Sequence, residues 1–142
     1  MEVSAMFVKI LVATDGSEHA LRAVKKAVEV AKCNPESVIH LVYVIESSKA
    51  EVLNNWNTTG AQDKREEKVR PTAEILKAAE INYKVEYLQG EPGPAIVKHA
   101  NENEFDVVVV GSRGINRFQE LVLGSVSHKV AKRVKCAVLI IK

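Results

Sequence analysis

Five segments of the chain have the apolar pattern of β-strands. They are Phe7–Ala13, Val38–Ile45, Tyr83–Leu88, Asp106–Val110 and Ala137–Ile141. Four are almost continuous apolar runs, which are typical of strands in a parallel sheet covered by helices on both faces. Tyr83–Leu88 is different, because Lys84 and Glu86 alternate with apolar residues. That alternation predicts a half-exposed strand at a sheet edge.

Helical patterns fill the intervals between the strands. The expected helices run from Ser17 to just before Asn34-Pro35, from about Gln62 to Glu80, from Pro94 to about Asn101, and through the stripe Val126, Val130 and Val134. The first helix can be capped by Ser17. Its apolar face consists of Ala20, Val24, Ala27 and Ala31. In the second helix, Pro71 must either start the helix or kink it. Residues 46–60 are expected to form a loop.

Strict alternation of strands and helices predicts right-handed crossovers and a doubly wound α/β fold. We expect one domain over residues 1–142, with a five-stranded parallel sheet in the order 3-2-1-4-5 and helices on both faces. In that order the chain reverses direction between the first and fourth strands, and ligands bind beyond the carboxyl ends of the strands at such a point. The prediction directs attention to Ala13–Gly16 and to Gly111 onward.

Composition narrows the choice of partners. The chain has 142 residues, of which 46% are hydrophobic and 27% are charged, with a net charge of +2. This balance gives no support for a nucleic acid or an anionic membrane as partner. No apolar run approaches the roughly 20 residues that cross a bilayer, and the amino-terminal residues lack the pattern of a signal peptide. We therefore expect a cytoplasmic protein.

The cysteines and histidines show no metal-binding pattern. Cys33 and Cys136 are far apart in sequence, form no CxxC motif, and are expected to be buried packing residues. The histidines are His19, His40, His99 and His128. They are scattered along the sequence without ligand spacing, which argues against a metal site.

A group of glycines follows the fourth strand. Gly111-Ser112-Arg113-Gly114 is separated by nine residues from Gly124-Ser125-Val126-Ser127, which opens the last helix. Glycines let the backbone approach a phosphate closely and adopt positive φ. The amides at a helix amino terminus attract anions. Arg113, Arg117 and the serine hydroxyls would complete a polyphosphate cradle, although each half alone is also common turn and capping chemistry.

The spacing Gly111-x-x-Gly114-(nine residues)-Gly124-Ser125 resembles the ATP-binding signature of universal stress proteins. Val12-Ala13-Thr14-Asp15-Gly16-Ser17 resembles the end of the first strand in that family. The similarity in element order covers essentially the whole chain. It implies a homodimeric five-stranded α/β domain that holds ATP.

The resemblance also implies roles for individual residues. Ala13 and Val44 would contact adenine through backbone groups. Asp15 would lie near the ribose or a Mg²⁺ ion on the phosphates, although it can also serve as the cap of the following turn. The ribose and phosphates would be wrapped by Gly111, Ser112, Arg113, Gly114 and Arg117. The phosphate tail would be held by Gly124, Ser125, Val126 and Ser127.

These observations favour a binding protein over an enzyme. We expect a regulatory, stress-response protein whose bound nucleotide, ATP or alternatively AMP, alters its interaction with an unidentified protein partner. The alternative is a slow ATPase or a self-phosphorylating protein, with Ser125 or Ser127 as the acceptor. Hydrolysis needs a group that orients water, and the sequence ties no second carboxylate or glutamine to the site.

The last strand predicts a homodimer. In the order 3-2-1-4-5, Ala137–Ile141 lies at an open edge of the sheet and carries no charge. Edge strands normally carry charges, prolines or bulges that discourage pairing. Two-fold pairing of this strand would close the assembly. The alternative is that a helix or the amino-terminal residues of the same chain cover the edge.

Overall fold

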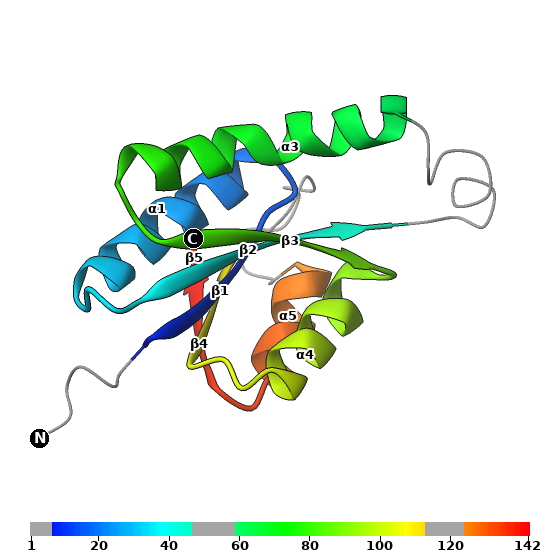
Figure 1. Cartoon of the computed structure of the whole chain (residues 1–142). Coiled ribbons are helices and arrows are strands. Elements are labelled where there is room, and N and C mark those ends of the chain that lie inside the picture. The colour runs from blue at the N-terminus through cyan, green and yellow to red at the C-terminus, as the bar shows by residue number, and fades with distance from the viewer. Residues whose placement is uncertain (1–6, 47–58, 113–123) are drawn as a thin grey trace, which may run out of the picture.

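A five-stranded parallel sheet forms the centre of the protein (Figure 1). The computed structural model describes residues 7–46, 59–112 and 124–142. The elements in chain order are β1 (Lys9–Ala13), α1 (Glu18–Lys32), β2 (Val38–Ile45), α3 (Thr59–Ala78), β3 (Tyr83–Gln89), α4 (Pro92–Glu102), β4 (Val107–Gly111), α5 (Ser125–Arg133) and β5 (Ala137–Ile141).

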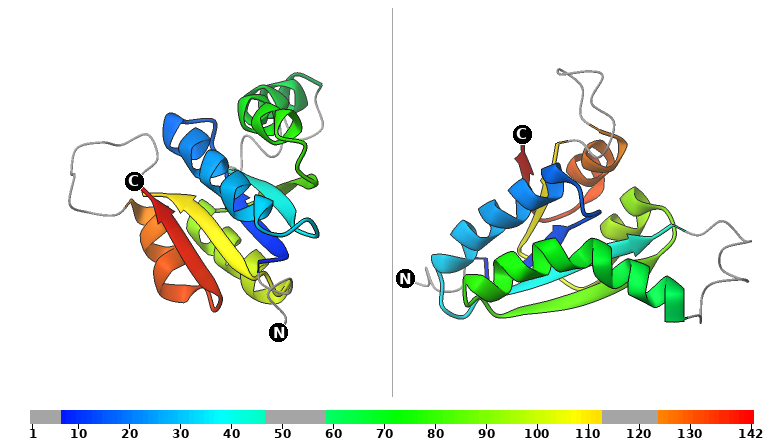
Figure 2. Two further views of the ribbon diagram at one scale, coloured as in Figure 1. Left: turned by 90° about the vertical axis from the view of Figure 1, so that its left-hand side faces the viewer. Right: turned by 90° about the horizontal axis from the view of Figure 1, so that it is seen from above.

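The strands lie in the order β3-β2-β1-β4-β5, and every neighbouring pair is parallel. This confirms the predicted order and the edge position of β3. Helices α1 and α3 cover one face of the sheet, and α4 and α5 cover the other (Figure 2). The continuous valines of β4 are buried because they meet a helical layer on each side.

The first helix follows its predicted pattern. Its buried face includes the four residues expected from the sequence, Ala20, Val24, Ala27 and Ala31. The Ser17 side chain accepts a hydrogen bond from the Ala20 amide at 3.3 Å, which confirms the predicted cap.

Two helices begin earlier than predicted. Helix α3 begins at Thr59, so the last two residues of the loop predicted over 46–60 are helical instead. Residues 47–58 lie outside the described residues. Pro71 lies inside α3 instead of starting it. Helix α4 begins at Pro92, not Pro94, because proline is well accommodated in the first turn, where its missing N–H is not needed.

The predicted burial of the cysteines is wrong. Cys33 is exposed and Cys136 is half-buried. Cys33 follows the last turn of α1, beyond the stripe that faces the sheet. Cys136 lies just before the edge strand β5. Cys136 packs partly against the core between the sheet and helices α4 and α5, whereas Cys33 faces solvent. No helix of the described residues is long and apolar enough to cross a membrane.

Candidate functional site

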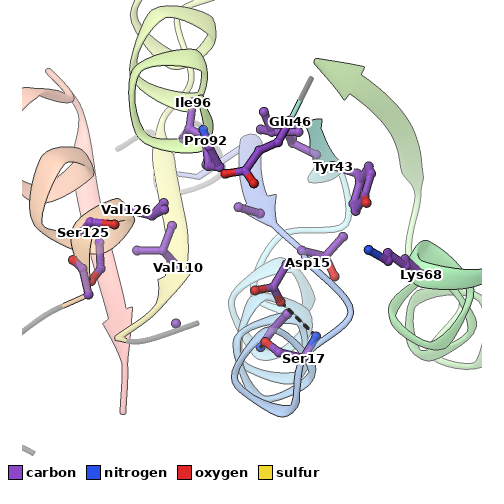
Figure 3. Close-up of a pocket in the computed structure, with 18 of the residues that line it drawn as sticks. Asp15, Ser17, Tyr43, Glu46, Lys68, Pro92, Ile96, Val110, Ser125 and Val126 are labelled. Atoms are coloured by element: carbon purple, nitrogen blue, oxygen red, sulfur yellow. Dashed lines mark hydrogen bonds between the residues drawn. The ribbon is translucent and has the colours of Figure 1, made fainter. Parts of the chain in front are cut away.

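A pocket of about 640 Å³ lies where the carboxyl ends of β1, β2 and β4 meet the first turns of α4 and α5 (Figure 3). This is the switch point of the sheet, between β1 and β4. The volume lies within the range of small-molecule sites in proteins. Lys68 of α3 closes one side of the pocket, and Ser125 of α5 lies on the opposite side.

The middle of the pocket is apolar. Among the residues that line it are Ala13, Val42, Val44, Ile96 and Val110. They come from β1, β2, α4 and β4, so they meet only in the folded chain. A wall of this kind can pack against the flat face of an aromatic base.

The loop after β1 is shaped by local hydrogen bonds. The Thr14 amide donates to the Val42 carbonyl oxygen at 2.9 Å, and the Ser17 amide donates to Asp15 Oδ1 at 2.9 Å. Between them, Gly16 has φ +82°, and a Cβ there would lie 3.0 Å from the Lys68 carbonyl oxygen. Asp15 therefore caps the turn and also lines the pocket, with its side chain exposed.

The other side of the pocket joins β4 to α5. The Ser112 carbonyl oxygen accepts hydrogen bonds from the Gly124 amide and from Ser127 Oγ, both at 2.8 Å. Ser127 is 1% exposed, and its hydroxyl also lies 3.0 Å from the Gly124 carbonyl oxygen. This hydroxyl is therefore committed to backbone carbonyls, whereas Ser125 is exposed at the start of the helix.

The first turn of α5 supplies donors to the pocket. Ser125, Val126 and Ser127 all line it. They form the first turn of the helix, where amides have no partner within the helix. Such a turn carries partial positive charge and is suited to an anion.

Positive φ is not the reason for glycine at 111 or 124. Gly124 has φ −62°, and the described glycines with positive φ are Gly16 and Gly90. At Gly111, a Cβ would lie 3.1 Å from both Cβ and the carbonyl oxygen of His19. Glycine at this position lets α1 pack closely on the end of β4.

The structure brings together most of the residues that the sequence predicted. Those that line the pocket are Ala13, Asp15, Val44, Gly111, Gly124, Ser125, Val126 and Ser127. Ser112 is buried beneath them and holds Gly124 and Ser127. Arg113, Gly114 and Arg117 lie outside the described residues.

Sequence reasoning missed several pocket residues. Tyr43 and Glu46 line the pocket from the end of β2, and Lys68 does so from α3. Glu46 also overturns the expectation that no second carboxylate lies at the site. Its place at a strand end next to the switch point was a usable signal. Lys68 had none, because its place depends on how α3 packs against the loop at Gly16.

The histidines are less scattered than the sequence suggests. His40 and His99 both contact Glu86 on the α4 side of the sheet. Across the ranges that the structure describes, no group of three His, Cys, Asp or Glu side chains is arranged to hold a metal ion. The pairing escaped sequence analysis because the three residues come from β2, β3 and α4.

A doubly wound parallel sheet with a pocket at its switch point defines the class of the protein, a doubly wound α/β domain with a candidate ligand site. Residues 6–142 match the Universal stress protein family, and the chain belongs to that family.

Individual relatives align over almost the whole chain. Universal stress protein YxiE of Bacillus subtilis is 35% identical over 96% of this chain and 100% of YxiE. The solved structure of protein MJ0577 is similar with a TM-score of 0.82 and 28% identity, covering 97% of each chain. A universal stress protein in complex with cAMP has a TM-score of 0.75 and 27% identity, covering 94% of this chain and 95% of its own.

Proposed function

We propose that this chain is an ATP-binding universal stress protein, with AMP as the alternative nucleotide. One observation carries the proposal: a single pocket joins an apolar wall of strand ends to the first turn of α5. The wall suits a base and the helix turn suits phosphate. A protein of the same family, 27% identical to this chain, has been solved in complex with cAMP, which supports an adenine nucleotide as the ligand.

The proposed ligand lies across the pocket. Adenine contacts Ala13 and Val44, and Asp15 lies near the ribose. The phosphates extend toward Gly124, Ser125 and Val126 at the start of α5. Gly111 and Ser112 shape this end, and Ser127 holds it in place through its hydrogen bonds. Arg113, Gly114 and Arg117 belong to the same proposal as residues that wrap the ribose and phosphates.

The residues present fit a Mg²⁺ ion that arrives with the nucleotide. Asp15 offers a carboxylate at the pocket, and one of its oxygens is engaged by the Ser17 amide. Mg²⁺ prefers oxygen ligands and is commonly held by one or two carboxylates together with substrate phosphates. Asp15 would be the protein ligand, and the ion would neutralise phosphate charge.

We propose a binding role in place of efficient catalysis. Asp15 and Glu46 line the pocket, but neither has a described hydrogen-bond partner of the kind that would position it as a base for water. Turnover well below the general enzyme median of about 10 s⁻¹ is expected. A steady-state ATPase assay tests this, and multiple turnovers at ordinary enzyme rates would favour the enzymatic alternative.

The proposal extends to assembly and cellular role. The β5 edge is open, with Leu139 37% exposed. A second copy pairing along Ala137–Ile141 would cover it and give a closed homodimer. We place this dimer in the cytoplasm, where its nucleotide state would regulate contact with an unidentified protein partner.

Calorimetry with ATP tests the pocket directly. Gly124→Val places a branched side chain at the N-cap residue of α5, and we expect it to weaken ATP binding at least tenfold, about 1.4 kcal/mol. Ala131→Val is the matched control, because it adds bulk to an exposed position of the same helix. Thermal unfolding of both variants separates lost binding from lost folding. Unchanged affinity in folded Gly124→Val would contradict a phosphate site at this turn.

Mass spectrometry of ligand released from the purified native protein distinguishes ATP from AMP. Recovery of neither nucleotide, together with no calorimetric binding, would overturn the proposed function.

A further inference from the structure

Two histidines share one carboxylate oxygen on the α4 side of the sheet. Glu86 Oε1 of β3 lies 2.7 Å from His40 Nδ1 of β2 and 3.3 Å from His99 Nε2 of α4. The side chains of His40 and His99 are 10% and 17% exposed, and that of Glu86 is 30% exposed. The cluster therefore ties α4 to two strands in a largely buried position.

The hydrogen bonds fix the protonation of His99. Asn103 Nδ2 lies 2.9 Å from the His99 carbonyl oxygen and 3.2 Å from His99 Nδ1. An amide nitrogen can only donate, so Nδ1 of His99 accepts and the ring proton is on Nε2, facing Glu86. A second proton on His99 would place two donors against each other at Asn103, the residue that caps the carboxyl end of α4.

The cluster lies beside an aromatic ring and near groups that already carry positive charge. The rings of His40 and His99 contact Phe105, with centroids 4.8 and 5.5 Å away. Two cations lie on neighbouring elements: Lys9 of β1, whose Nζ is 4.6 Å from the Phe105 ring, and Lys84 of β3, which pairs in register with His40.

The acidic groups nearby do not compensate for a further positive charge on the histidine cluster. Asp106, before β4, accepts from the Val8 and Lys9 amides. On α4, Lys98 and Glu102 are exposed. Burial raises the pKa of Glu86, but hydrogen bonds and charge from His40 and His99 lower it by more, so its net shift is downward. Glu86 is therefore still ionised in the pH range in which an ordinary imidazole takes up a proton, which is near pH 6.5.

The same elements form a wall of the candidate pocket. On β2, Val42 lines the pocket two residues after His40. On α4, Ile96 lines it one turn before His99, and Pro92 lines it at the start of the helix. The histidine cluster and the wall that faces the proposed base therefore share the same strand and the same helix.

We propose that the His40–Glu86–His99 cluster positions α4 and makes nucleotide affinity depend on pH. This rests on the proposed function. With His99 neutral, at most one imidazolium, that of His40, lies beside Glu86, and α4 is held in place. A proton on Nδ1 of His99 adds positive charge to the cluster and breaks the hydrogen bond between Asn103 and His99. The wall at Pro92 and Ile96 then loosens, and binding weakens.

The proposal is tested by calorimetry. ATP affinity is measured at pH 7.5 and at pH 5.5, in the wild type and in the His99→Gln variant. Glutamine can donate to Glu86 and does not take up a proton. We expect the two proteins to have similar ATP affinity at pH 7.5. On going to pH 5.5, the wild type should lose affinity by a factor at least about fivefold larger than the variant does, because fivefold is the lower end of typical couplings between sites. Protonation of the nucleotide phosphates is common to both proteins and cancels in the ratio.

Two further measurements keep the outcomes distinct. Nitrogen-15 NMR of the ligand-free wild type should show the Nε2–H tautomer of His99 at pH 7.5; the Nδ1–H tautomer would overturn the inference. Equal pH responses in the wild type and His99→Gln would also overturn it, while leaving the proposed function intact. A wild type that binds no ATP at pH 7.5 would instead contradict the proposed function.

Discussion

Ser125 and Ser127 lie two residues apart on the first turn of α5 but have different surroundings. The hydroxyl of Ser127 is buried against the carbonyls of Ser112 and Gly124. Ser125 is exposed at the pocket. Between the two serines that the sequence offered as phosphate acceptors, only Ser125 presents its side chain to solvent at the pocket.

Replacing each serine with alanine should separate stability from binding. Ser127→Ala is expected to lower the free energy of unfolding by about 1 kcal/mol, the usual net value of an internal hydrogen bond. Ser125→Ala should leave stability within about 0.5 kcal/mol, as exposed substitutions generally do, and weaken ATP binding. Urea denaturation and calorimetry measure the two effects. Equal losses of stability would contradict the assignment.

Lys68 is the residue that the sequence gave no reason to place at the site. Lys68 is the single basic residue, Lys or Arg, among the described residues that line the pocket. Asp15 and Glu46 contribute two carboxylates to the same lining. An anionic nucleotide would therefore meet unfavourable charge without it. Its ammonium group is exposed, so its effect is expected to be modest.

Lys68→Gln should weaken ATP binding about fivefold, near the 1 kcal/mol upper range of exposed charge interactions. Lys77→Gln is the matched control, because it removes an exposed lysine from the same helix away from the pocket. Calorimetry with ATP and adenosine shows whether the loss depends on phosphate. A loss of the same size in Lys77→Gln would indicate only a general charge effect.

At the scale of elements, α3 packs against α1 and the sheet through Val69 and Leu76, and Thr72 between them is also buried. Thr72 Oγ1 donates to the Val69 carbonyl oxygen at 2.7 Å. Pro71 lies between them and is exposed. Proline has no amide proton for the helical hydrogen bond, so it weakens the helix without contributing to the core.

Pro71→Ala is expected to raise the free energy of unfolding by up to about 3 kcal/mol, the difference between proline and alanine inside a helix. Glu74→Ala, an exposed change in the same helix, should have an effect below about 0.5 kcal/mol. Chemical denaturation of both variants checks the difference. A destabilised Pro71→Ala would show that the proline fits a bend on which packing of α3 depends.

At the scale of the whole molecule, the sheet has two different edges. Leu139 on β5 is 37% exposed and Val85 on β3 is 36% exposed, so the two edges present similar apolar side chains. They differ in charge, because β3 also carries Lys84 and Glu86 whereas Ala137–Ile141 carries none. Charge at an edge discourages pairing with another chain, which favours β5 as the interface of the proposed dimer.

Leu139→Lys should therefore convert a dimer to a monomer, because it places a charge in the middle of the paired strand. Val85→Lys makes the same change at an equally exposed position of the other edge and should leave the dimer intact. Light scattering at micromolar concentration measures both. A wild type that is monomeric under these conditions would rule out the proposed dimer.

The sequence by itself determined the parallel sheet, the order of its strands and the part of the sheet where a pocket would form. These properties follow from local periodicity and from the rules that connect successive strands and helices. The continuous valines before Gly111 and the alternation around Lys84 are local patterns, so they could be read without coordinates.

Tertiary structure alone decided which side chains meet. Lys68 reaches the pocket because α3 packs on the turn at Gly16. Cys33 is exposed because it caps the carboxyl end of α1, beyond the buried face of that helix. His40 and His99 share Glu86 because β3 pairs with β2 beneath α4. Residues distant in sequence are brought into contact by register and by helix packing, and neither is encoded in the local pattern of hydrophobic and polar positions.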